Sequence, residues 1–289
     1  MDYRIVTDSG SDLSPRMVEE LDVTLIPLHS VMKSSKGDET LDGNTIGLSD
    51  VYALLRQRYS ATTSAVNVDA FTEAFEAILK EGKDVLYLGL SSGLSATYRA
   101  AELAAEDLRE RYPESKLIVI DTLAASLGHG MLVHLAVQKK REGKTIEEVS
   151  AFIRESIPHT CHWFTVDDLF FLKRGGRVSA TTAIVGTALG IKPVMHVDDE
   201  GHLIKREIAR GRKKSLAALC EKMKKTVVAP ETQTVFISHG DCLADAEYLA
   251  DLIRREIPVK EIVIDYIGSV IGTHLGPGTV ALFYLGTHR

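Results

Sequence analysis

The stretch from Asp84 to Tyr98, DVLYLGLSSGLSATY, constrains the fold of this chain more than any other. Its branched and aromatic residues from Val85 to Leu90 predict a strand buried in a parallel sheet. The strand pattern stops at Ser91-Ser92-Gly93, and a helix pattern then runs from about Ser95 to Arg111. A strand, a small polar turn and a helix N-terminus favour anion binding, because the first N–H groups of a helix have no partner within it. The alternative is that Ser95 serves only as the N-cap of that helix.

Strand and helix patterns alternate through the first half of the chain, up to about residue 157. This alternation predicts a mainly parallel sheet whose two faces are covered by helices. The expected strands are Tyr3–Val6, Val23–Leu28, Val85–Leu90 and Lys116–Ile120. Ligands of such sheets bind beyond the carboxyl ends of the strands. The polar residues that should converge there are Asp8, Ser9, Ser91, Ser92, Ser95 and Asp121.

Two polar segments of this half are expected to be irregular. Residues 33–47 are polar and contain glycine, which favours a loop. Residues 61–65, Ala-Thr-Thr-Ser-Ala, are expected to form a third hydroxyl-rich turn before a helix that ends near Glu81. Further on, Thr145 and Glu148 have the spacing of a capping box, which predicts the start of another helix.

The pattern changes after Pro158, where strand patterns become more frequent. A hairpin is expected from Lys192–Val197 and His202–Ile208, and a glycine-rich turn at Thr273–Gly278. The other expected strands are Thr160–Val166, Thr234–Ser238, Glu261–Ile267 and Val280–Leu285. We therefore expect an α/β protein of two domains, with a mainly parallel sheet in residues 1–157 and a mixed sheet in residues 158–289.

Composition and charge exclude several classes of function. The 289 residues carry a net charge of −6, which is unlike the basic surface of nucleic-acid-binding proteins. No apolar run approaches the ~20 residues of a membrane span, and the N-terminus lacks the pattern of a signal peptide. The three cysteines are far apart and form no C-x-x-C. These features predict a reduced, cytoplasmic protein without disulfides or a zinc site.

The chain carries no common motif for a metal or a nucleotide. His159 and His162 are three residues apart on an expected strand, so they should face opposite sides of the sheet. Neither H-E-x-x-H nor G-x-x-x-x-G-K-[ST] occurs. We therefore expect no metal and no cofactor.

Gly89-Leu90-Ser91-Ser92-Gly93 matches G-x-S-x-G between a strand and a helix, as in the nucleophile elbow of α/β-hydrolases. Asp121 or Asp167 and then His274 follow in the order that such a triad requires. The pattern is short, and no HGGG-type oxyanion segment precedes it. A serine esterase that uses Ser91 is therefore the alternative function.

Two further side chains could meet an anion. His274 could donate to a carboxylate or act as a base, or be a surface histidine. Arg177 follows two glycines and could meet either a ligand or a surface carboxylate. The basic run in residues 205–214 is typical of a solvated face, or of a docking patch for an acidic partner.

Several motifs occur together in one order along the chain. They are Val6-Thr7-Asp8-Ser9, Thr63-Ser64, Leu90-Ser91-Ser92-Gly93-Leu94-Ser95-Ala96-Thr97-Tyr98, Phe171-Leu172-Lys173-Arg174-Gly175-Gly176-Arg177-Val178-Ser179, Lys192-Pro193 and His274-Leu275-Gly276. In this set the chain resembles, over essentially its whole length, the DegV family, the fatty-acid-binding proteins of bacterial fatty acid kinases.

The resemblance implies a long-chain fatty acid held in a tunnel between the two domains, with its carboxylate buried. On matching positions the carboxylate would be met by Thr63, Ser95 and His274, with Ser64 as a neighbouring hydroxyl. The resemblance also implies a role for Arg177 near the head group or the partner surface, while Ser92 and Gly93 complete the ligand-binding turn. The family protein is not itself catalytic, because a separate kinase subunit phosphorylates the bound acid to an acyl phosphate that feeds phospholipid synthesis.

The chain also departs from the family pattern at the predicted head-group end. Ala65-Val66 stands where the family often has Gln-Pro, and Ala96 where it often has Gly. The first difference could change the pocket near the head group. A third hypothesis is that the Ser-Ser-Gly turn binds a small anion or a sugar phosphate, which predicts a compact polar pocket.

Overall fold

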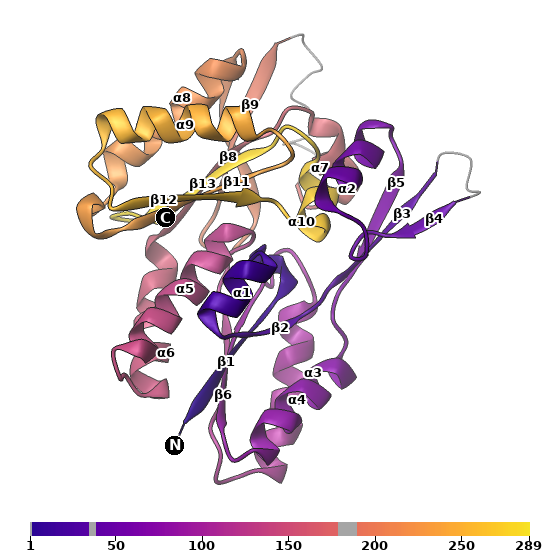
Figure 1. Ribbon diagram of the computed structural model, residues 1–289, viewed down its shortest axis with the longest axis vertical. Coiled ribbons are helices and arrows are strands. Elements are labelled where there is room, and N and C mark those ends of the chain that lie inside the picture. The colour runs from indigo at the N-terminus through magenta and orange to yellow at the C-terminus, as the bar shows by residue number, and fades with distance from the viewer. Residues whose placement is uncertain (1, 35–38, 179–189) are drawn as a thin grey trace.

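The computed structural model describes residues 2–34, 39–178 and 190–289. A four-stranded parallel sheet with the order β2-β1-β6-β7 forms the lower part of the molecule in Figure 1. Its strands are β1 (Tyr3–Asp8), β2 (Thr24–Ile26), β6 (Asp84–Gly89) and β7 (Leu117–Asp121). Every residue of β6 is buried, as expected for a central strand covered on both faces. The predicted parallel sheet is confirmed.

Helices cover both faces of this sheet. On one face lie α3 (Val68–Lys80) and α4 (Thr97–Arg111), and on the other α5 (Leu127–Arg141) and α6 (Ile146–Ser156) (Figure 1). The short helix α1 (Pro15–Leu21) follows β1. The capping box that opens α6 is present, with Thr145 and Glu148 each bonded to the backbone of the other.

A second, six-stranded sheet has the order β10-β9-β8-β13-β11-β12 and is antiparallel except between β11 and β12. Its strands are β8 (Thr160–Thr165), β9 (Ile191–Val197), β10 (Leu203–Arg210), β11 (Thr234–His239), β12 (Glu261–Tyr266) and β13 (Val280–Leu285). The predicted hairpin is β9–β10, and the mixed sheet is confirmed. Its outer face is covered by α8 (Arg212–Thr226) and by α9 (Leu243–Glu256), a helix that we did not predict.

Side chains alternate across the second sheet and divide the core in two. On β13, Val280, Leu282 and Tyr284 pack with α8 and α9 on the outer face. Ala281 and Phe283 belong instead to the larger core, which continues into the parallel sheet. This two-residue period is what a strand covered on both faces requires. The larger core contains residues from both sides of residue 157 and therefore does not separate two domains there. The predicted domain boundary stays a prediction.

Helix α5 lies between the two sheets and packs against both. It contacts β1 and β6 on one side and β8, β11 and β13 on the other. All residues from Leu127 to Val133 are buried. Two glycines permit the close approach: a Cβ on Gly128 would lie 2.3 Å from His162 Nε2, and one on Gly130 2.8 Å from the Ser11 carbonyl oxygen.

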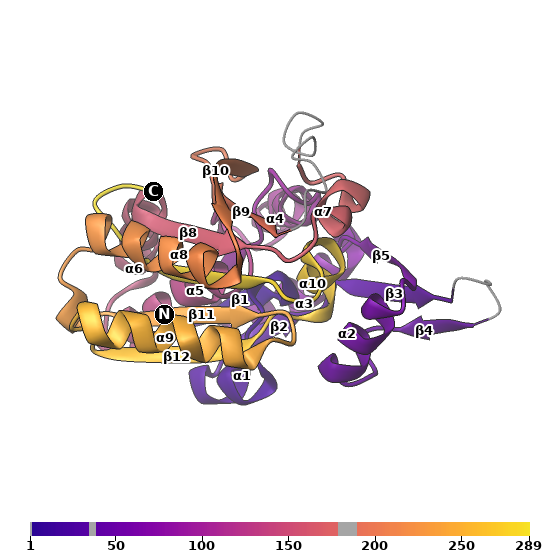
Figure 2. The same cartoon turned by 90° about the horizontal axis from the view of Figure 1, so that it is seen from above.

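A small antiparallel sheet, which we did not predict, projects to one side of the molecule (Figure 2). It has the order β4-β3-β5 and consists of β3 (His29–Lys33), β4 (Thr40–Asp42) and β5 (Ser60–Ser64), next to α2 (Leu48–Arg56). The predictions of a loop over residues 33–47 and a turn over 61–65 are therefore wrong in part. β4 has only three residues and β5 carries hydroxyl residues on both faces, so no apolar alternation marked these strands.

The predicted turn at Thr273–Gly278 is also wrong in its first half. Helix α10 (Ser269–Leu275) occupies it and packs on α2, β3, β5 and α7 (Leu169–Gly175). The packing requires glycine at position 272, because a Cβ there would lie 2.5 Å from the hydroxyl oxygen of Tyr52. A dense run of glycines therefore marks close contact here as well as turns.

Candidate ligand-binding site

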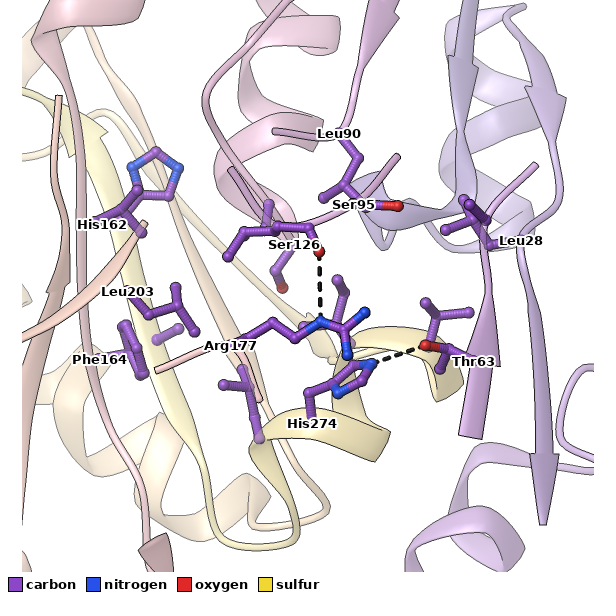
Figure 3. A pocket seen from close by; sticks show the side chains of 18 of the residues that line it. Leu28, Thr63, Leu90, Ser95, Ser126, His162, Phe164, Arg177, Leu203 and His274 are labelled. Carbon is purple, nitrogen blue, oxygen red and sulfur yellow. Dashed lines mark hydrogen bonds between the residues drawn. The ribbon is translucent and has the colours of Figure 1, made fainter. Parts of the chain in front are cut away.

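A cavity of about 220 Å³ lies where the carboxyl ends of the parallel strands meet the inner face of the second sheet (Figure 3). It exceeds the roughly 150 Å³ apolar cavity that can take up benzene. Most of its lining is apolar and includes Leu90 after β6, Phe164 on β8, Val197 and Leu203 on the hairpin, and Phe283 on β13. The site therefore suits a largely apolar ligand.

Five of the residues predicted from sequence line this cavity. They are Thr63, Ser64, Ser95, Arg177 and His274. They come from β5, the turn after β6, the segment after α7, and α10, so the fold brings together segments far apart in sequence.

Ser92 and Gly93 do not line the cavity. Ser92 is exposed, and its backbone N–H donates to the Asp121 carboxylate at 3.2 Å. Gly93 lies beneath the tip of the β9–β10 hairpin, where a Cβ would come within 2.8 Å of the Glu200 carbonyl oxygen. A role for these two residues in binding is therefore indirect at most, through the shape of the turn.

Thr63 and His274 form a pair at one end of the cavity. Thr63 Oγ1 lies 2.8 Å from His274 Nε2, and Figure 3 shows this contact as a dashed line. The other ring nitrogen, Nδ1, is buried and has no hydrogen-bond partner among the described residues. A Cβ on Gly175 would lie 2.5 Å from Nδ1, so the glycine of the Arg-Gly-Gly-Arg turn makes room for the ring.

The imidazole of His274 is neutral in this environment. Burial is the main cause that lowers its pKa to about 4, and the positive charges of Arg177 and Arg174 contribute to the same shift. A neutral imidazole has one donor and one acceptor nitrogen. In the tautomer in which Nε2–H donates to Thr63, the threonine hydroxyl hydrogen is available to an oxygen of a ligand.

The start of α4 supplies further donors at this end. Ser95 and the N-cap residue Ala96 both line the cavity, and α4 begins at Thr97, two residues later than predicted. Ser95 Oγ accepts from the Thr97 backbone N–H at 3.2 Å and lies 2.9 Å from Thr97 Oγ1. Because the N-terminal end of a helix carries partial positive charge, this arrangement favours a ligand anion.

Arg177 brings the full positive charge to the same end. It is exposed overall, and one terminal nitrogen of its guanidinium donates to the Gly175 carbonyl at 2.6 Å. Its Nε donates to the Leu94 carbonyl at 3.4 Å. These contacts hold the cation beside His274 (Figure 3). Ser179, the last residue of the motif that contains Arg177, lies outside the described residues.

A buried carboxyl stands behind the cavity wall. Asp12 Oδ2 lies 2.6 Å from the hydroxyl of Ser126, which lines the cavity and is also 3.0 Å from Ser238 Oγ. Burial raises the pKa of Asp12 to about 8. At neutral pH this side chain is therefore mostly protonated and adds no full negative charge next to the cavity.

The contacts of Ser91 do not assemble the triad of a serine esterase. Its fully buried hydroxyl donates to the Gly201 carbonyl at 3.0 Å and accepts from the Gly93 N–H. Meanwhile His274 bonds to Thr63, and Asp121 accepts backbone N–H groups. Asp167 pairs with Lys192. The serine of a Ser-His-Asp triad needs a histidine within hydrogen-bond reach, and the described partners of Ser91 include none.

The opposite end of the cavity contains a residue that we did not predict as part of the site. His162 on β8 lines the cavity together with Phe164, two residues along the same strand, and with Phe283 on the neighbouring strand. We considered His162 only as a metal ligand. The signal available was the period of two, which places His162 and Phe164 on one face of a strand.

Among residues 2–34, 39–178 and 190–289, no cluster of three or more His, Cys, Asp or Glu side chains could hold a metal ion. Within the same ranges, every helix is too short or too polar to span a bilayer.

Together the two packed sheets and the mostly apolar cavity with one polar end define an α/β protein with a candidate ligand site. A family model described as "uncharacterised protein, DegV family" matches residues 2–287. The chain belongs to the DegV family.

Individual relatives agree in both sequence and structure. A DegV domain-containing protein of Clostridium perfringens is 45% identical over 284 residues, covering 98% of this chain and 97% of the relative. A solved DegV family protein from Thermus thermophilus, described by its fatty acid binding, has a TM-score of 0.86 and 30% identity, covering 99% of this chain and 100% of the other. A DegV lipid-binding protein from Thermotoga maritima has a TM-score of 0.84 and 29% identity, and each chain is covered completely.

Proposed function

We propose that this protein binds one long-chain fatty acid, with the carboxylate at the Thr63–His274 end and the acyl chain along the apolar lining. The observation that carries the proposal is an apolar cavity with hydroxyls, a neutral histidine, a helix N-terminus and an arginine at one end. The solved relatives described as binding fatty acids or lipid support it.

The energetics favour such a ligand. Burial of apolar chain contributes about 0.8 kcal/mol per methylene, so ~14 methylenes give on the order of 11 kcal/mol before ordering costs. A buried carboxylate without partners would cost several kcal/mol. The donors of Thr63 and Ser95, the α4 N-terminus and the charge of Arg177 offset that cost. A sugar phosphate would leave the aromatic and aliphatic lining without matching ligand surface.

The protein would not itself catalyse a reaction. In this proposal it is a cytoplasmic carrier that presents the bound acid to a separate kinase subunit, which transfers phosphate to the carboxylate. Thr63 pairs with His274 at the cavity, but Nδ1 of His274 has no partner among the described residues, so no carboxylate orients the ring as a catalytic triad requires. Arg177, exposed at the polar end, lies where such a partner would approach the carboxylate.

The first experiment is mass spectrometry of an organic extract from natively purified protein. A stoichiometric long-chain fatty acid supports the proposal. An empty extract together with no uptake of added fatty acids contradicts it.

The polar end is tested by a matched pair of substitutions on β5. Thr63→Val removes the hydroxyl that contacts His274, whereas Thr62→Val makes the same change on the exposed neighbour that points the other way. We expect fatty acid affinity to fall about 10- to 100-fold for Thr63→Val, because a hydrogen bond to a charged group contributes ~1.5–3 kcal/mol. Thr62→Val should bind normally. Equal affinity of the two variants would remove Thr63 from the site.

Presentation to a kinase is tested separately with the catalytic subunit, ATP and protein loaded with fatty acid. Ser95→Ala and His274→Ala should abolish acyl phosphate formation while circular dichroism shows the fold intact. Normal rates in both variants would contradict the assignment of the carboxylate end.

A further inference from the structure

Thr97, the first residue of α4, is fully buried beside the polar end of the cavity. It does not line the cavity, so neither solvent nor a ligand can take up the hydrogen of its hydroxyl group. Among the described residues, the only hydrogen-bond partner of Thr97 Oγ1 is Ser95 Oγ, at 2.9 Å. The distance alone does not say which of the two hydroxyls donates.

Burial decides the direction of this hydrogen bond. If Ser95 donated to Thr97, the Thr97 hydrogen would be buried without an acceptor, which is unfavourable and uncommon in native structures. If Thr97 donates to Ser95, its buried hydrogen is bonded and only the hydrogen of Ser95 remains to be placed. The second arrangement is therefore favoured.

Ser95 Oγ then accepts two hydrogen bonds from one residue. The other donor is the Thr97 backbone N–H, at 3.2 Å. A hydroxyl oxygen has two acceptor lone pairs and one hydrogen, so both lone pairs are used and Ser95 can only donate. Two accepted bonds also polarise its O–H group and strengthen the bond that it donates.

The remaining hydrogen of Ser95 is available to a ligand. Ser95 is partly exposed and lines the cavity, whereas Thr97 does not. In Figure 3 the Ser95 hydroxyl oxygen lies on the side of the site where Leu28 and Thr63 stand. A ligand group that only accepts hydrogen bonds, such as an ionised carboxylate, matches this donor.

We infer that Thr97 is a positioning residue: it never touches the ligand, and it holds the Ser95 hydroxyl as an obligate donor to the carboxylate. This inference rests on the proposed function and adds the residue that fixes the polarity of its serine. The competing role for Thr97 is a purely structural one at the start of α4.

The first test compares dissociation constants of hexadecanoic acid for two substitutions of Thr97 in delipidated protein. Thr97→Val keeps the branched shape and removes the hydroxyl, whereas Thr97→Ser keeps the hydroxyl. We expect Thr97→Val to weaken binding about 3- to 10-fold, as the loss of one hydrogen bond predicts. Thr97→Ser should bind within about twofold of the unmodified protein. Normal binding by Thr97→Val, or equal weakening in both variants, would overturn the inference.

The second test separates positioning from a structural role by a double-mutant cycle with Ser95→Ala. Without the Ser95 hydroxyl there is nothing for Thr97 to orient, so Thr97→Val should change the dissociation constant of Ser95→Ala by less than about twofold. The same weakening in both backgrounds would show that Thr97 acts through the structure of α4 and would overturn the inference. Absence of binding by the unmodified protein would instead contradict the proposed function.

Discussion

Two histidines border the cavity, and they share a charge state but not their surroundings. Both His274 and His162 are neutral because burial lowers their pKa, and each has one ring nitrogen without a partner among the described residues. His274 sits on the short helix α10, against a small polar sheet and beside Arg177. His162 sits in the middle of the second sheet, against Phe283 and α5. The difference suggests that one end of the cavity serves an anion, while the other belongs to the core.

The largest expected effect is a difference between the two ends of the cavity in how much a substitution lowers the free energy of unfolding. Phe283→Ala should lower the free energy of unfolding by about 3–5 kcal/mol, because it removes a buried ring from the core shared by both sheets. His274→Ala should change it by no more than about 1 kcal/mol, since it removes one hydrogen bond and also an unpartnered buried nitrogen. Urea unfolding of both variants measures this. Equal losses would show that the polar end is as much part of the core as the other.

An intermediate effect is expected at the contact of α5 with His162. Alanine normally stabilises a helix relative to glycine, yet Gly128→Ala should destabilise the protein by about 1–3 kcal/mol because the new methyl group meets the ring. In a His162→Asn background the shorter side chain leaves room, so the added methyl group should cost less. A double-mutant cycle by urea unfolding gives the coupling energy. Additive effects would mean that the ring does not limit this position.

The smallest effect is a dependence on pH at the polar end. His274 has a pKa of about 4 when folded and about 6.5 when unfolded, so the unfolded chain binds more protons between these values. Stability from this residue is complete above pH 6.5 and falls as the pH falls toward 4. Between pH 7 and pH 6 its share is under about 1 kcal/mol.

The matching control is His274→Gln, which should flatten the stability profile between pH 7 and pH 6 by that share. A bound fatty acid should also reduce the dependence, because a nearby carboxylate favours the charged ring. Identical profiles for the variant and the unmodified protein would exclude a lowered pKa at His274.

The sequence predicts the parallel sheet well because its strands are short apolar runs that end in polar turns. β6 and the Ser91–Ser95 turn illustrate this. In the second sheet, β13 likewise begins and ends where the apolar run does. The small sheet is hidden because β4 is only three residues long and β5 carries hydroxyl residues on both faces. Their packing partners, α2 and α10, lie elsewhere in the chain, and a local pattern does not show such contacts.

The candidate site divides in the same way. Thr63, Ser95, Arg177 and His274 were predicted through the family resemblance, and the structure brings them to one cavity. His162 was not predicted to line the cavity, because this depends on how its ring packs against Gly128 of α5 and Phe283 of β13. Both contacts are properties of the packed molecule, and no spacing of residue types contains them.

The position of α5 has a consequence for folding. Because this one helix supplies an apolar face to both sheets, neither half can bury its own surface if the other is absent. The chain should therefore unfold as one cooperative unit despite its two sheets. Amide exchange in β6 and β13 should then report the same opening free energy, and either half made alone should expose apolar surface and aggregate.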